Sequence, residues 1–168
     1  MVEYMKEFLE KPHQVFQGLP ICPFARKARL ENRILYKVHR FSIHPDLNPD
    51  SPVMEMIREF CQEERYEVLL VLHPEKQALT QAQMQQFIYR LNEKIAAVGL
   101  VAFSGHPDQE FNIQGIYTRQ EPYLNFTVQY NDRLKDASDL LLKTTDYYQN
   151  WTAENLRYVG IPRESNCS

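Results

Sequence analysis

The chain has little cysteine, no long hydrophobic run and no excess of charge of either sign. Of its 168 residues only 3 are Cys, and the longest uninterrupted apolar stretch is Val68–Leu72. A membrane-spanning helix needs about 20 apolar residues, so we expect no membrane insertion. Three widely spaced cysteines without a secretory signal are not typical of a disulfide framework. We therefore expect a soluble, cytoplasmic protein.

The charge balance excludes a basic nucleic-acid-binding surface. The 19 Lys and Arg residues face 22 Asp and Glu, which gives a formal net charge of −3, whereas nucleic-acid binding needs a basic excess. The hydrophobic fraction of 43% is usual for a globular protein with a core. The length fits a single domain, 1–168, with a flexible tail at 163–168. The sequence does not indicate an oligomeric state.

Hydrophobic periodicity predicts strands that mostly alternate with helices. Four strands are expected at 34–41, 68–72, 100–103 and 124–130. About five helices are expected at 2–9, 53–61, 81–98, 132–141 and 147–158. This order predicts an α/β (α+β) fold, a single-domain sandwich with a mixed or antiparallel sheet of about four strands.

Three local signals support these elements. Ser51 before Pro52 is typical of a helix start, and the segment from Thr80 to Gln83 has the form of a capping box. Gly99 is placed to end the helix that follows. The last predicted strand alternates apolar residues with three polar ones, which predicts a half-buried strand with a polar face: Asn125, Thr127 and Gln129.

Cys22 is the first candidate functional residue. It lies between Pro20 and Pro23, which restrict the backbone and favour a stiff loop. A basic run, residues 26–29, follows it, and nearby positive charge would stabilise a thiolate. Cys22 is therefore a candidate nucleophile, metal or haem ligand, or redox thiol; the alternative is a small side chain that fills a tight pocket beneath Phe24. Cys61, on the apolar face of a predicted helix, is expected to be buried.

Two His-Pro pairs follow predicted strands. His73 comes after the strand 68–72 and His106 after the strand 100–103, so both are expected at the sheet edge where open α/β sheets bind ligands. With Asp108, these histidines are candidate metal ligands. His106 with Asp108 could also serve Cys22 as a catalytic base and its orienting group. The alternative is that each histidine only satisfies its own loop.

Arg119 lies on the long segment 104–122, which is expected to be functional or disordered. Its guanidinium could bind a substrate carboxylate in bidentate fashion, or form a salt bridge with Glu121 or Asp108. Arg26 and Tyr123 are further candidate substrate-binding residues.

An ordered set of short motifs along the chain resembles a bacterial family catalogued as domain of unknown function 1415. The resemblance covers about residues 4–161 and implies no particular activity. The chain departs from the family pattern by one extra residue between Arg119 and Pro122, and by the loss of a strand histidine in the 125–127 region. The Cys22 loop also resembles, distantly, haem-dependent bacterial N-oxygenases, which makes haem a candidate cofactor. The motifs are Cys22-Pro-Phe-Ala25, Leu72-His-Pro74, Phe103, His106-Pro107, Phe111, Arg119, Pro122-Tyr123, Asn155-Leu-Arg157 and Gly160.

Two hypotheses about function follow from these residues. The first is an enzyme that acts on a small polar metabolite in a pocket formed by the Cys22, His73 and His106 loops. Its catalytic residues would be Cys22, His106 and Arg119, and its oxidoreductase version would use haem or a transition metal. The second is a non-catalytic module that binds a small-molecule ligand or a protein partner.

Overall fold

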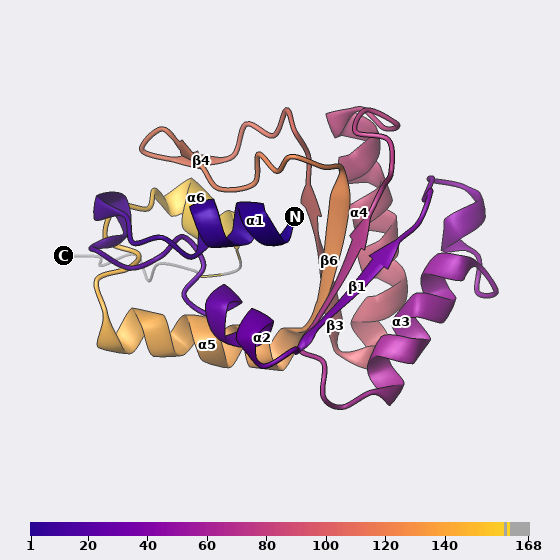
Figure 1. Cartoon of the computed structure of the whole chain (residues 1–168), viewed down its shortest axis with the longest axis horizontal. Coiled ribbons are helices and arrows are strands. Elements are labelled where there is room, and N and C mark those ends of the chain that lie inside the picture. Colours follow the sequence, from indigo (N-terminus) through magenta and orange to yellow (C-terminus); the bar gives the residue numbers. More distant parts are fainter. Residues whose placement is uncertain (160, 162–168) are drawn as a thin grey trace.

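A mixed four-stranded sheet is the centre of the molecule in the computed structural model, which describes residues 1–159 and 161 (Figure 1). The strand order is β1-β2-β6-β3. β1 and β2 are parallel, and β6 is inserted antiparallel between β2 and β3. The predicted four-stranded mixed sheet is confirmed. The strands are β1 (Ile34–Val38), β2 (Val68–Leu72), β3 (Leu100–Gly105) and β6 (Asn125–Tyr130).

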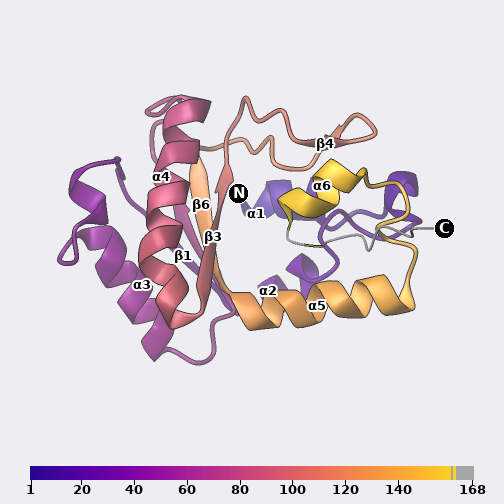
Figure 2. The same cartoon turned by 180° about the vertical axis from the view of Figure 1, so that it is seen from behind.

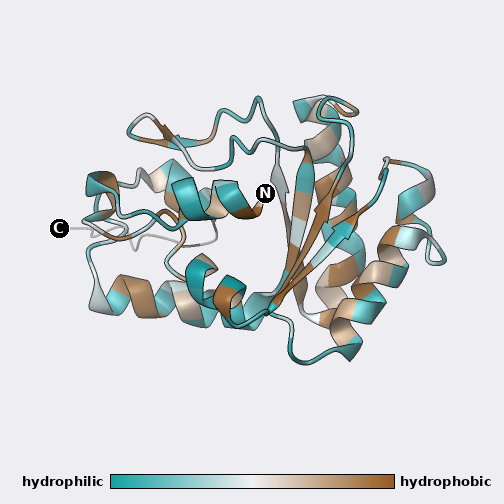
Figure 3. Cartoon of the chain, in the orientation of Figure 1, coloured by the Kyte–Doolittle hydropathy of each residue, from teal (hydrophilic) through white to brown (hydrophobic). Residues whose placement is uncertain are grey.

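Two helices cover one face of the sheet, α3 (Pro52–Gln62) and α4 (Gln81–Ile95) (Figures 1 and 2). Their apolar faces pack with alternate strand residues into the largest core cluster, since successive strand side chains point to opposite faces. Figure 3 shows hydrophobic residues concentrated in the strands, while the loops are largely hydrophilic. The strand members of this cluster are Leu35, Leu69, Val71, Leu100, Ala102, Phe126 and Val128.

The predicted helix signals are confirmed. The Ser51 hydroxyl accepts a hydrogen bond from the backbone N–H of Met54, with Pro52 in the first turn. Thr80 and Gln83 form the capping box of α4. Gly99 has a φ of 75°, a left-handed conformation that glycine adopts without steric cost and that ends the helical segment.

A second layer, built from both ends of the chain, covers the opposite face of the sheet (Figure 1). It contains α1 (Val2–Tyr4), the π-helical turn η1 (Met5–Leu9), the 3₁₀ turn η2 (Gln14–Phe16), α2 (Ala25–Leu30), α5 (Asn131–Thr144) and α6 (Ala153–Tyr158). The loop between β3 and β6 carries a small hairpin, β4 (Asn112–Ile113) and β5 (Ile116–Tyr117). Two 3₁₀ turns, η3 (Pro45–Leu47) and η4 (Ala96–Val98), flank the helices of the first layer.

Some predictions about individual elements are wrong. The last helix begins only at Ala153, and α2 and the small hairpin were not expected, because their short apolar patterns are too brief to show a period. Cys61 is exposed, since α3 turns Ile57 and Phe60 toward the core instead. The predicted tail, 163–168, which includes Cys167, lies outside the described residues. No helix in the described part of the chain is long and apolar enough to cross a bilayer.

Candidate functional site

The polar face of β6 looks toward the second layer. Asn125, Thr127 and Gln129 alternate with Phe126 and Val128, which are fully buried on the helix-covered side. β6 lies in the middle of the sheet, where a strand covered on both faces is normally apolar on both. The predicted polar face is therefore present, and it indicates that β6 borders a site on this side of the sheet.

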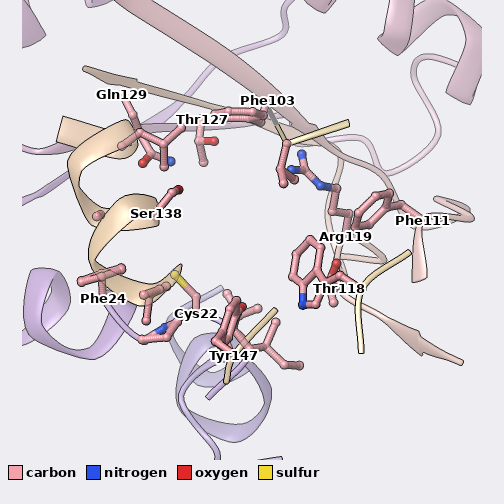
Figure 4. Close-up of a pocket in the computed structure, with 18 of the residues that line it drawn as sticks. Cys22, Phe24, Phe103, Phe111, Thr118, Arg119, Thr127, Gln129, Ser138 and Tyr147 are labelled. Atoms are coloured by element: carbon pink, nitrogen blue, oxygen red, sulfur yellow. The ribbon is translucent and has the colours of Figure 1, made fainter. Parts of the chain in front are cut away.

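A cavity of about 280 Å³ lies against this face. Figure 4 shows Thr127 and Gln129 on its sheet side, Cys22 opposite them, and Ser138 and Arg119 on the two flanks. These residues come from β6, the Cys22 loop, α5 and the loop between β3 and β6. The fold therefore brings Cys22 and Arg119 to one cavity, as the sequence predicted, but on the face of the sheet rather than at its edge.

Arg119 lies among aromatic rings. Its guanidinium carbon is 5.1 Å from the ring centroid of Phe103, 5.4 Å from that of Phe111 and 5.2 Å from that of Tyr158. Within residues 1–159 and 161 the guanidinium has no hydrogen bond or ion pair, so the predicted alternative of a salt bridge to Glu121 or Asp108 is wrong. Burial lowers the pKa of Arg119, yet a guanidinium stays charged at neutral pH. Its N–H donors thus have no acceptor in the part of the chain that the structure describes.

Glu121 lines the same cavity and is held by Asn125. The amide nitrogen of Asn125 donates to Glu121 Oε2 at 2.6 Å and to the Tyr123 carbonyl at 2.9 Å. Burial raises the pKa of Glu121 to about 7, against the opposing effects of Asn125 and Arg119. Glu121 can therefore gain or lose a proton near neutral pH, which an ordinary exposed carboxylate cannot do.

Two buried polar atoms near Glu121 lack partners. Asn125 is fully buried and its Oδ1 accepts no hydrogen bond from the described residues. The Tyr4 hydroxyl is also unpaired within that part of the chain, and burial together with the Glu121 charge raises the pKa of Tyr4. Buried polar atoms are rarely left without a partner. Asn125 lines the cavity, so a polar group bound there could reach its Oδ1.

Cys22 contributes a protonated thiol to the cavity. Burial raises its pKa, and the charges of Glu10 and Glu121 add to this effect, although backbone hydrogen bonds oppose it. The prediction that the basic run stabilises a thiolate is wrong, because Arg29 binds Glu10 through two hydrogen bonds of 2.6 and 2.7 Å. Cys22 therefore lacks the electropositive surroundings of a nucleophilic cysteine.

The two histidines do not reach the cavity. His106 is buried, its Nε2 lies 3.0 Å from the Leu79 carbonyl, and its Nδ1 accepts from the backbone N–H of Asp108 at 3.0 Å. Both ring nitrogens are occupied and neither lies at the cavity, so His106 cannot serve Cys22 as a base. The Asp108 carboxylate is largely exposed, 4.0 Å from His106 Nδ1. The loops after β2 and β3 do contact each other. The contact is the hydrogen bond between His106 and the Leu79 carbonyl, not one between the rings of His73 and His106.

His73 also belongs to the packing of its own loop. Its ring meets Phe41 edge-on at 5.1 Å, and its Nδ1 bonds to the backbone of Glu75. Burial lowers the pKa of His73. Among residues that the structure describes, no group of three or more His, Cys, Asp or Glu could hold a metal ion. The predicted metal ligands His73, His106 and Asp108 therefore form no such group, and haem as a cofactor stays a prediction.

Arg26 and Tyr123, expected to bind substrate, do not line the cavity. α2 buries Ala25 and Ala28, which leaves Arg26 exposed to solvent. Tyr123 is exposed and packs against Lys76, whose Nζ is 5.1 Å from the ring centroid. Both residues therefore lie away from the cavity, because each short segment turns its apolar residues inward and leaves these two side chains at the surface.

The cavity also contains residues that the sequence did not single out as functional. They are Glu121, Asn125, Thr127, Gln129 and Ser138. The polar face of β6 was a usable signal for three of them, because a central strand with polar residues on one side needs an explanation. No family model, curated protein or solved structure matches the chain. The site is therefore interpreted from its own chemistry.

Proposed function

We propose that the protein binds a small anionic metabolite in the cavity, with Arg119 holding the anionic group. The observation that carries this proposal is a guanidinium that lines a cavity and forms no hydrogen bond or salt bridge with the described residues. A carboxylate fits best, because the planar fork of arginine donates two parallel hydrogen bonds to it. The rings of Phe103, Phe111 and Tyr158 hold the guanidinium in place without consuming its donors.

The neighbouring groups favour a ligand that also carries a hydrogen-bond donor. Asn125 Oδ1 is an unused acceptor in the described structure, and its amide orientation is fixed because Nδ2 donates to Glu121 and to the Tyr123 carbonyl. A hydroxyl or N–H of the ligand would satisfy it. A cavity of 150 Å³ holds benzene, so about 280 Å³ suits a ligand of about a dozen non-hydrogen atoms.

Titration with glycolate, followed by NMR shifts of cavity residues, tests this proposal. Arg119→Gln should weaken glycolate binding by about tenfold or more, since a hydrogen bond to a charged group contributes about 1.5–3 kcal/mol. Arg26→Gln is the matched control, because it removes the same charge from an exposed position and should leave binding unchanged. Equal affinity of wild type and Arg119→Gln would overturn the proposal.

An acid–base enzyme is the second candidate function, and the pKa of about 7 for Glu121 favours it. Pyruvate is a suitable probe, because the carbonyl acidifies its methyl group. Glu121 would take a methyl proton, the C–H electron pair would form the enolate, and a deuteron from D₂O would complete the exchange. Deuterium incorporation should be lost in Glu121→Gln; exchange in wild type no faster than in this variant would contradict a catalytic role.

We also propose the cytoplasm as the compartment. Cys22 and Cys61 are both unpaired thiols, which supports a reducing environment.

A further inference from the structure

A second chamber, of about 290 Å³, adjoins the first. The two share a wall that includes the sheet residues Thr127 and Gln129, the acid Glu121 and the thiol of Cys22. Interiors are normally packed to the density of organic crystals, so two adjoining hollows of this size are unusual. The shared residues are Leu9, Cys22, Phe24, Glu121, Thr127, Gln129, Leu134 and Ala137.

The two chambers differ in chemistry. The guanidinium of Arg119 and the Asn125 amide belong to the first chamber alone. The second is bounded by an apolar set, all members of one buried cluster: Met5, Ala25, Ala28, Ile34 and Leu70. Its charged lining side chains are Glu121, in the shared wall, and two at its outer boundary, Glu67 and Arg133. Arg133 is exposed on α5, and Glu67 forms an ion pair with Arg33.

We propose that the ligand is a carboxylate with an apolar tail, its head at Arg119 and its tail in the second chamber. This inference rests on the proposed function, because Arg119 fixes the position of the head. Alanine side chains at 25 and 28 leave the chamber open where α2 faces the sheet. Beyond the shared polar wall, a charged tail would meet only the apolar side chains of Met5, Ala25, Ala28, Ile34 and Leu70, and would lose its hydration against them without gaining a partner.

A series of straight-chain carboxylates tests the inference by calorimetry: acetate, butyrate, hexanoate and octanoate. Affinity should rise by about fourfold for each added methylene, the equivalent of about 0.8 kcal/mol, until the chamber is filled. Hexylamine carries the same tail on a cation and should bind much more weakly than hexanoate. If acetate binds and the longer acids bind no better, the inference fails while the proposed function stands. If none of the acids binds, the proposed function fails.

Ala28→Leu fills the second chamber and should remove the gain from chain length, while acetate binds as in wild type. Ala82→Leu is the matched control, since Ala82 is exposed on α4 and outside both chambers. Where Ala28→Leu lowers the melting temperature, Ala28→Val gives a smaller obstruction and should reduce the gain in part. An unchanged hexanoate affinity in folded Ala28→Leu would overturn the inference.

Discussion

The amide nitrogen of Asn125 lies 2.6 Å from the Glu121 carboxylate and thereby ties the first residue of β6 to the loop that carries Arg119. Asn125 pairs with Gly105 of β3 across the sheet. The acid of the cavity is therefore positioned by an inner strand of the sheet. A loop residue that would otherwise be free to pair with Arg119 is kept beside it, with both groups facing the cavity.

Gly105→Ala should destabilise the protein by about 1–3 kcal/mol, the usual cost of overpacking. A Cβ at residue 105 would lie 2.4 Å from Asn125 Nδ2 and 2.7 Å from Glu121 Cδ, so at least one of the two side chains must move. Urea denaturation measures the change. In an Asn125→Ala background the same substitution should cost less, and strictly additive effects of the two substitutions would contradict the proposed contact.

The raised pKa of Glu121 makes stability depend on pH. The folded state holds this proton more tightly than the unfolded chain, whose carboxyl keeps its ordinary pKa of 4.5. The stabilisation is fully present below 4.5 and is lost as pH rises through about 7, by up to about 3 kcal/mol. Wild type should therefore lose stability relative to Glu121→Gln between these pH values.

Urea denaturation of wild type and Glu121→Gln at a series of pH values checks this dependence. Glu93→Gln, at an exposed position of α4, should run parallel to wild type across the whole range. A Glu121→Gln curve that also runs parallel to wild type would show that the Glu121 carboxyl titrates normally.

The sequence predicted the features that depend on neighbouring residues, but not those that depend on contacts between residues far apart in the chain. The alternation in β6 and the caps at Ser51 and Thr80 are local patterns, so they gave the sheet and its first layer correctly. The environment of Cys22 depends on a contact between distant residues. Glu10 binds Arg29, nineteen residues away in the sequence, so the positive charge of Arg29 is neutralised and does not stabilise a Cys22 thiolate. The closeness of the basic run to Cys22 in the sequence therefore led to a wrong prediction about the thiol.

The candidate site likewise contains one key residue that the sequence predicted and one that it did not. Arg119 was recognisable because an arginine on a long loop can bind an anion. Glu121 was not, since its role requires the hydrogen bond from Asn125, the desolvation of its carboxyl and the close approach of Gly105, none of which the sequence states.

The Cys22 thiol should react slowly with maleimide. Its raised pKa leaves little thiolate at neutral pH. In a Cys61→Ser/Cys167→Ser background, labelling of Cys22 at pH 7 should be slower than that of a model thiol such as N-acetylcysteine. Faster labelling would restore Cys22 as a candidate nucleophile.

His106→Ala should lower stability by about 2 kcal/mol or more, because it leaves the Leu79 carbonyl and the Asp108 N–H without their partners. Glycolate affinity of the folded variant should stay within about twofold of wild type. A selective loss of glycolate binding at unchanged stability would instead place His106 in the site.

The most direct measurement is a crystal structure with bound 4-bromobenzoate, whose bromine is located by anomalous scattering. The carboxylate should lie about 2.7–2.9 Å from the Arg119 guanidinium, and the bromine should lie in the chamber lined by Ala28 and Leu70. The same soak of Arg119→Gln crystals should show no bromine in the cavity. Bromine found only at the surface, or a carboxylate bound in the cavity away from Arg119, would contradict the account.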